Sequence, residues 1–303
     1  MTEAMLLLPD FLLIALGALL VRTPALPRTL WAGVERLVYL VLFPALLFSA
    51  IARNPLSLAS AAPLAGLALA LTGVGIALAL ALRAFRGVDA ALHASGAQTA
   101  FRFNTYVALA LAERLAGGPG VAWMALLVAV AVPVVNVGAV WPLARHGGQG
   151  VVRELVRNPL ILATVAALLF NASGLNLPGM VQVTLSRLGA AALPLGLLAV
   201  GAGLQLGALR LAPGLAAALL GIRHAVLPAL ALLLLWKSGL ERPQQAVVMA
   251  FASLPTASSA YVLAVRMGGN GPYTAGLVTV STLLGMATLP LWLWLWKGLA
   301  VMP

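Results

Sequence analysis

Apolar runs of about 20 residues fill this chain, and they decide the solvent in which it can fold. An α-helix rises 1.5 Å per residue, so about 20 apolar residues cross the ~30 Å hydrocarbon layer of a bilayer. Ten such runs occur, at residues 5–21, 31–52, 57–82, 94–115, 119–142, 158–175, 188–207, 213–236, 243–265 and 273–297. Breaks rich in Pro and Gly, such as Gly117-Gly118-Pro119 and Asn158-Pro159, separate them. The sequence therefore predicts an all-α membrane protein with ten transmembrane helices.

Composition and charge agree with a bilayer as the partner. The chain is 62% hydrophobic and only 8% charged, whereas soluble domains average about 25% charged residues. Its formal net charge of +11 would suggest nucleic acid in a soluble protein, but the Lys and Arg residues lie singly between apolar runs. We therefore expect no nucleic-acid partner. Cytoplasmic loops carry more Lys and Arg than external ones, and this bias predicts a multi-pass protein with both termini outside.

An internal repeat organises the ten runs into two halves. At an offset of about 150 residues, Phe43-Pro44 falls on Leu193-Pro194 and Ala62-Pro63 falls on Ala212-Pro213. Ala112-Glu113-Arg114 likewise falls on Ala264-Val265-Arg266. With five spans in each half, the second half must cross the membrane in the opposite sense. The sequence thus predicts two inverted five-helix repeats, residues 1–150 and 151–303, an organisation common in secondary transporters.

The fourth predicted span carries a polar interruption in the stretch from Gln98 to Glu113. Arg102, Asn104, Thr105 and Tyr106 stand there close together, in the sequence FRFNTY. A charge at the bilayer centre costs roughly 2.5 kcal/mol or more, and no acidic residue lies within a helical turn of Arg102. This arginine must snorkel, face a water-filled cavity, or bind backbone carbonyls at a break in the helix.

The repeat pairs this stretch with residues 254–258 of the ninth span. Pro255 lacks a backbone N–H and clashes with the preceding turn, so the ninth helix should break there. Interrupted helices at matching positions of two repeats indicate a transporter's binding site, because half-helix N-termini offer N–H groups and a positive dipole end to an anion. Alternatively, Pro255 is a plain kink and Asn104 a contact between packed helices. The predicted substrate site comprises Arg102, Asn104, Thr105, Tyr106, Asn136, Pro255, Thr256, Ser258, Ser259 and Tyr261.

Other polar residues inside predicted spans point less clearly to a site. Asn136 lies in the fifth span and either lines the same cavity or holds the broken helix. Arg223 and His224 lie in the eighth span, where we consider a proton relay and favour a pair that snorkels to the membrane surface. The sequence lacks the common hydrolase, phosphate-loop and metal-ligand motifs. We therefore expect no enzyme activity and no cofactor or metal.

The chain resembles the auxin efflux carrier family, including its bacterial malonate-transporter-like members, over essentially its whole length. The most specific parts are FRFNTY at 101–106, Leu254-Pro255-Thr256-Ala257 with Tyr261-Val262-Leu263-Ala264, and the C-terminal segment from Ser281 to Trp292. The resemblance implies a scaffold of spans 1, 2, 6 and 7 that forms a homodimer, and a moving domain of spans 3–5 and 8–10. It also implies broken fourth and ninth helices that cross at the membrane midplane, with Asn104 and Pro255 at the crossing. The long cytoplasmic loop of the plant carriers is reduced here to residues 147–157, so auxin itself is not implied.

Together these features predict an inner-membrane secondary transporter for a small organic anion, such as a carboxylate, that works by an elevator-like motion. One alternative is a sodium-coupled organic-anion symporter of the bile-acid type, although the predicted core has no buried carboxylate. Another is a membrane receptor that binds its ligand without carrying it.

Overall fold

The computed structural model describes residues 3–53, 58–84, 89–144, 159–204, 209–257 and 259–300 of the protein, and within these ranges the regular structure is entirely helical. The predicted boundary between the repeats, at residues 150 and 151, lies outside them. The helices are α1 (Glu3–Leu20), α2 (Arg28–Leu37), η1 (Val38–Leu42), α3 (Phe43–Arg53), α4 (Leu58–Ala81), η2 (Leu82–Ala84), α5 (Ala90–Ala97), η3 (Gln98–Ala100), α6 (Thr105–Ala144), α8 (Pro159–Ala172), α9 (Gly179–Ala202), η4 (Leu209–Leu211), α10 (Pro213–Gly221), η5 (Ile222–Val226), α11 (Leu227–Leu235), α12 (Arg242–Ser253), α13 (Ser259–Arg266) and α14 (Gly271–Ala300).

Six helical stretches among the described residues are long and apolar enough to cross a membrane. They are Arg28–Arg53, Ala61–Ala84, Ala90–Leu143, Gly179–Ala202, Pro213–Leu235 and Gly271–Leu299, and the shorter apolar helices Leu8–Leu20 and Leu162–Ala172 accompany them. The prediction of an all-α protein that passes the membrane several times is therefore confirmed. The ten-helix inverted repeat stays a prediction at this point.

Two segments interrupt the helices where the sequence predicted breaks. The chain is non-helical at residues 102–104, between η3 and α6, and at residues 254–257, between α12 and α13. We call these segments the first and the second break. Pro255 explains the second, because it has no N–H to continue the helix. A third irregularity divides α6 near its middle, where Gly117 has a φ of +59° that L-residues rarely adopt.

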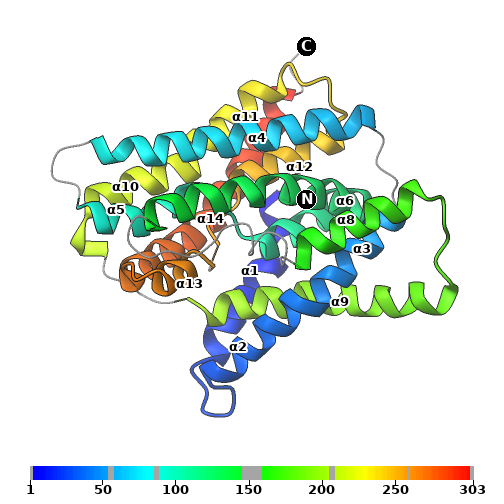
Figure 1. The fold of residues 1–303 in the computed structure, drawn as a ribbon, viewed down its shortest axis with the longest axis horizontal. Helices are drawn as coiled ribbons and strands as arrows, with labels where there is room; N and C mark the ends of the chain where they lie inside the picture. The colour runs from blue at the N-terminus through cyan, green and yellow to red at the C-terminus, as the bar shows by residue number, and fades with distance from the viewer. Residues whose placement is uncertain are drawn as a thin grey trace.

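The helices pack into two groups (Figure 1). In the first helix group, α9 packs on α1, α2 and α3, and α8 packs on α3. In the second helix group, α6 packs on α4 and α12, and α14 packs on α5, α12 and α13. The turn η5 and helix α11 pack on α4 and α12 and belong to the same group. The two groups meet chiefly where α6 contacts α3, α8 and α9. The border between them is therefore formed largely by the helix that follows the first break.

Close backbone contact joins α1 to α9 within the first group. A Cβ added to Gly201 would lie 1.8 Å from the carbonyl oxygen of Ile14, and one added to Gly17 would lie 2.0 Å from that of Leu198. Small residues let helix backbones approach in this way, which is a common means of helix association in membranes. The contact requires glycine at both positions.

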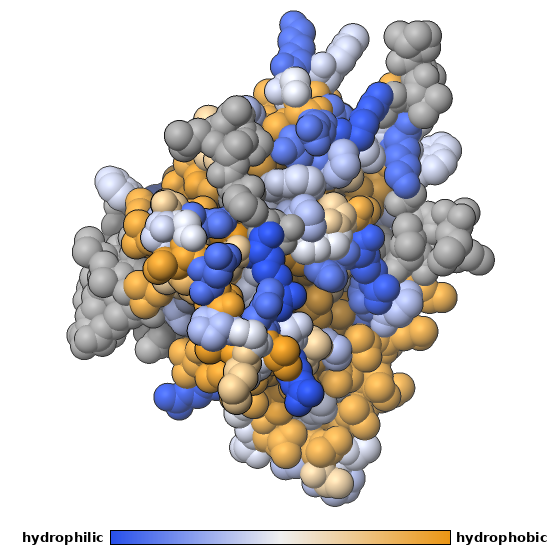
Figure 2. Space-filling view, turned by 90° about the vertical axis from the view of Figure 1, so that its right-hand side faces the viewer, coloured by the Kyte–Doolittle hydropathy of each residue, from blue (hydrophilic) through white to orange (hydrophobic). Residues whose placement is uncertain are grey.

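Much of the molecular surface is apolar, as lipid contact requires. Leu12, Leu16 and Leu19 of α1 and Leu162 and Leu169 of α8 are exposed. Figure 2 shows broad hydrophobic areas on one face, with hydrophilic side chains gathered in a band from its centre to its top. Such a surface would be unstable in water and suits a hydrocarbon environment.

We predict that Gly201→Val separates α1 from α9 and lowers stability by about 1–3 kcal/mol, since the added carbons have no room. Gly66→Ala in α4 is the matched control, because no atom lies within 4 Å of its added Cβ. A thermal-unfolding scan of the purified proteins in detergent measures the difference. Equal melting temperatures for Gly201→Val and wild type would contradict the tight crossing.

Candidate functional site

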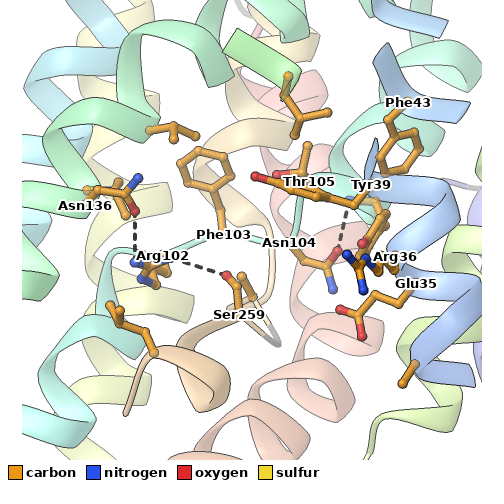
Figure 3. A pocket seen from close by; sticks show the side chains of 17 residues that line it. Glu35, Arg36, Tyr39, Phe43, Arg102, Phe103, Asn104, Thr105, Asn136 and Ser259 are labelled. Carbon is orange, nitrogen blue, oxygen red and sulfur yellow. Dashed lines mark hydrogen bonds between the residues drawn. The ribbon is translucent and has the colours of Figure 1, made fainter. Parts of the chain in front are cut away.

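A cavity of about 550 Å³ lies at the border of the two helix groups, directly against both breaks. The first group contributes Glu35, Arg36, Tyr39 and Phe43 from α2, η1 and α3. The second group contributes residues 102–106 of the first break and the start of α6, Asn136 of α6, and Ala257 and Ser259 from the second break and the start of α13. Figure 3 shows Arg102 and Asn136 on one side of the view and Glu35, Arg36, Tyr39 and Phe43 on the other. The volume is in the range of small-molecule sites.

Arg102 lies in the first break, and its side chain is held by both halves of the chain. Its guanidinium donates one hydrogen bond to Asn136 Oδ1 at 2.9 Å and one to Ser259 Oγ at 3.3 Å (Figure 3). Arg102 is only 9% exposed and lines the cavity. The arginine therefore reaches the cavity, which is one of the three possibilities that the sequence left open. Asn136 orients Arg102 as well as lining the same space.

Asn104 connects the two breaks and starts α6. Its backbone N–H donates to the carbonyl oxygen of Pro255 at 2.9 Å, so the two interruptions are hydrogen-bonded to each other. Its side-chain Oδ1 accepts from the N–H groups of Tyr106 (3.0 Å) and Val107 (3.3 Å). This is the geometry of a helix N-cap, which contributes about 0.5–2 kcal/mol. Asn104 therefore shapes the site through its backbone and its cap.

Tyr106 belongs to the border between the groups. Its ring packs on Phe43 of α3 with centroids 4.8 Å apart. The space beside it is kept open by Gly196 of α9, where an added Cβ would lie 3.0 Å from the Tyr106 ring. Thr105 lines the cavity next to it.

Three of the predicted site residues lie behind the cavity wall. Pro255 packs against Gly285 of α14, and the buried Thr256 donates its N–H to Ser281 Oγ of α14 at 2.9 Å. Tyr261 lies next to Gly271. None of the three is among the residues that line the cavity. Ser258 is outside the described residues, and the substrate-binding roles predicted for all four stay predictions.

Sequence reasoning missed the wall that α2 and η1 provide. Glu35, Arg36 and Tyr39 line the cavity, whereas the predicted substrate site included none of them and the predicted core had no buried carboxylate. The spacing of 35, 36 and 39 could have indicated a polar helix face, since residues three and four apart lie on one side. We overlooked this polar face because its three residues lie at the start of the apolar run 31–52, which we interpreted as one span.

The expectation that Arg223 and His224 snorkel to the membrane surface is wrong. Arg223 is 3% exposed and His224 6% exposed, both inside the second helix group. His224 is hydrogen-bonded through Nε2 to Ser281 Oγ (2.7 Å) and through Nδ1 to Thr288 Oγ1 (3.0 Å). Neither residue lines the large cavity. They contact the second break on the side away from the cavity: Arg223 donates to carbonyls at the end of α12, and His224 bonds the Ser281 hydroxyl that accepts from Thr256.

The electrostatics of the cavity favour an anion. The N-terminal ends of α6 and α13 both begin at its wall, and each helix N-terminus carries about half a positive charge. Arg102 precedes α6 by three residues and is hydrogen-bonded to Ser259, the first residue of α13, so it adds a full charge close to both. Glu35 and Arg36 on the opposite wall contribute charges of opposite sign. The positive side of the cavity is therefore the side formed by the two breaks.

Comparison with known proteins identifies the family of the chain. The family described as "Membrane transport protein" matches residues 142–293, half of the chain. A protein of Rhizobium meliloti (strain 1021) named "Putative malonate transporter" is 28% identical over 313 aligned positions, which cover 93% of this chain and 92% of the relative. The chain belongs to this membrane transport family, the auxin efflux carrier family, and it is a transporter rather than an enzyme.

Proposed function

We propose that this protein is a secondary transporter for a small organic anion, specifically a carboxylate, that binds where the two breaks meet. The observation that carries the proposal is the cavity in which Arg102 stands between the N-terminal ends of α6 and α13. Two helix dipoles and one guanidinium converge on a space large enough for a small carboxylate. The name of the Rhizobium relative makes malonate the first compound to test.

The proposal includes ten spans in two inverted repeats, residues 1–150 and 151–303. The positions of the breaks support it, because one precedes α6 and the other precedes α13, and each follows a short half-helix. The hydrogen bond from Asn104 to Pro255 is what two crossing broken helices would make. On this arrangement the crossing lies near the midplane of the bacterial inner membrane, and both termini are outside.

The proposed mechanism is an elevator motion of one helix group against the other. The first group would be the scaffold (spans 1, 2, 6 and 7), and the second would be the moving domain (spans 3–5 and 8–10). The packing supports this division, because most helix contacts lie within one group and the cavity lies on their border. The scaffold would also form the homodimer, through the exposed apolar faces of its helices.

Arg102→Gln should weaken carboxylate binding by roughly 10- to 100-fold, since a hydrogen bond to a charged group contributes about 1.5–3 kcal/mol. Arg102→Lys should lose less, because it keeps the charge. Arg187→Gln, an exposed arginine on α9, is the control and should bind as the wild type does. Ligand-induced increases in melting temperature, read across a panel of mono- and dicarboxylates, give the affinities.

Uptake of labelled malonate into proteoliposomes then distinguishes a carrier from a receptor. The proposal fails if no carboxylate of the panel raises the melting temperature of the wild-type protein or is taken up by proteoliposomes that contain it. It also fails at the level of the site if Arg102→Gln keeps wild-type binding and transport.

A second prediction tests the elevator motion through the ion pair between α1 and α6. Arg114 donates to both carboxylate oxygens of Asp10, at 2.5 and 2.8 Å, and so joins the two helix groups. A short bifunctional maleimide linking Asp10→Cys to Arg114→Cys should stop transport, because the groups could no longer slide. Malonate uptake before and after cross-linking measures the effect.

The control cross-link joins Arg53→Cys of α3 to Gln182→Cys of α9. Arg53 donates to the Gln182 carbonyl at 3.2 Å, and both helices belong to the first group. This link should leave transport intact. Undiminished uptake with residues 10 and 114 fully cross-linked would rule out a relative motion of the groups.

A further inference from the structure

Arg223 lies in the π-helical turn η5 of the second helix group. A π-turn adds a residue to the helix and is frequently found at functional sites. Here Ile222, Arg223 and His224 are buried in succession. The indole N–H of Trp292 donates to the His224 carbonyl at 2.8 Å, which satisfies a backbone group in this irregular turn. The turn thus presents a guanidinium to the interior of the group.

The guanidinium of Arg223 caps the carboxyl end of α12, immediately before the second break. One of its terminal nitrogens donates to the Ala252 carbonyl at 2.6 Å and to the Phe251 carbonyl at 3.2 Å. The last four carbonyls of a helix have no partner inside it, and together they carry about half a negative charge. The hydrocarbon core of a membrane holds no water to satisfy them, so the protein itself must supply their partners. Arg223 provides both the hydrogen bonds and the opposite charge.

Beyond these two carbonyls, the described surroundings of Arg223 hold no carboxylate partner and little room for solvent. Across the part of the chain that the structure describes, no carboxylate forms an ion pair with it. A cavity of about 10 Å³ adjoins it, between Thr72, Phe101 and Phe103, which is room for about one water molecule. The charge of Arg223 is therefore balanced by the carbonyl end of α12, and a hydrated metal ion has no space beside it.

Half-helix carboxyl ends with free carbonyls are places where transporters bind their coupling cations. We propose that Arg223 is a fixed cation at this position, which takes the place of a bound metal ion, so that the protein holds its second break and carries its anion without Na⁺ or K⁺. Arg223 is a positioning residue. It fixes the end of α12, and with it the Phe251 ring that packs on Phe103 at 4.8 Å and the Pro255 carbonyl that accepts from Asn104.

The test uses purified wild type, Arg223→Ala and Arg223→Lys, with Arg210→Ala in η4 as an exposed control. Melting temperatures are measured in choline chloride, NaCl, KCl and millimolar guanidinium chloride. The wild type should melt at the same temperature in Na⁺, K⁺ and choline. Arg223→Ala should melt at a lower temperature and regain part of the loss in guanidinium, which can occupy the vacated place. Arg223→Lys should lie nearer to the wild type, and Arg210→Ala should show no specific response.

Uptake of labelled malonate by the same proteins gives the second readout. Wild-type uptake should be equal with and without Na⁺, and Arg223→Ala should lose at least about tenfold and recover in guanidinium, since the lost group is a charge-assisted hydrogen-bond donor. This part rests on the proposed anion transport. The melting temperatures need no substrate, so failure of the transport proposal and failure of this inference can be distinguished.

Three results would overturn the inference. The first is a wild type that needs Na⁺ or K⁺ for stability or uptake. The second is a folded Arg223→Ala protein that guanidinium does not help. If Arg223→Ala fails to fold, the melting temperatures of Arg223→Lys and the uncharged Arg223→Met are compared in its place. A lysine variant as unstable as the methionine variant is the third contrary result, and a lysine variant close to wild type supports the fixed cation.

Discussion

The hydrogen bond from the Asn104 N–H to the Pro255 carbonyl is the contact on which the rest of the structure depends. Hydrocarbon offers no partner for backbone groups, so irregular chain inside a membrane protein must be satisfied by protein or line an aqueous cavity. The two breaks meet this requirement together, because the first supplies an N–H donor and the second supplies the carbonyl that accepts from it. Their meeting places the start of α6 and the start of α13 at one cavity.

The helix ends at the breaks have different surroundings: the N-terminal ends of α6 and α13 lie at the cavity, and the carboxyl end of α12 is buried. The N-terminal ends of α6 and α13 lie at the cavity beside Arg102, where we propose that an anion binds. The carboxyl end of α12 is closed by Arg223 inside the second helix group. At the cavity, Asn104 caps two N–H groups of α6, and the proposed anion would balance the remaining positive charge. At the carboxyl end of α12, Arg223 already supplies the positive charge.

Much of this could be predicted from the sequence, because single residues with strong physical preferences carry it. Pro255 cannot continue a helix, and Arg102 in an apolar run requires a cavity or a partner. The spacing of Glu35, Arg36 and Tyr39 indicates a shared polar face, but its position at the cavity could not be predicted, since that depends on how the first helix group faces the second. The inward position of Arg223 depends on the π-turn of η5, and a window of helical periodicity does not reveal one extra residue in a turn.

The most direct measurement of whether an anion occupies this cavity uses the absence of cysteine from the chain. Ala257→Cys introduces a single thiol on the cavity wall, and Ala90→Cys introduces one in a separate small cavity near Arg83 and Trp141. Each variant is labelled with a water-soluble maleimide at increasing malonate concentrations. The account predicts that a bound carboxylate slows labelling at 257, with a concentration dependence that matches its thermal stabilisation, and leaves the rate at 90 unchanged. Equal labelling of Ala257→Cys with and without a carboxylate that stabilises the protein would contradict it.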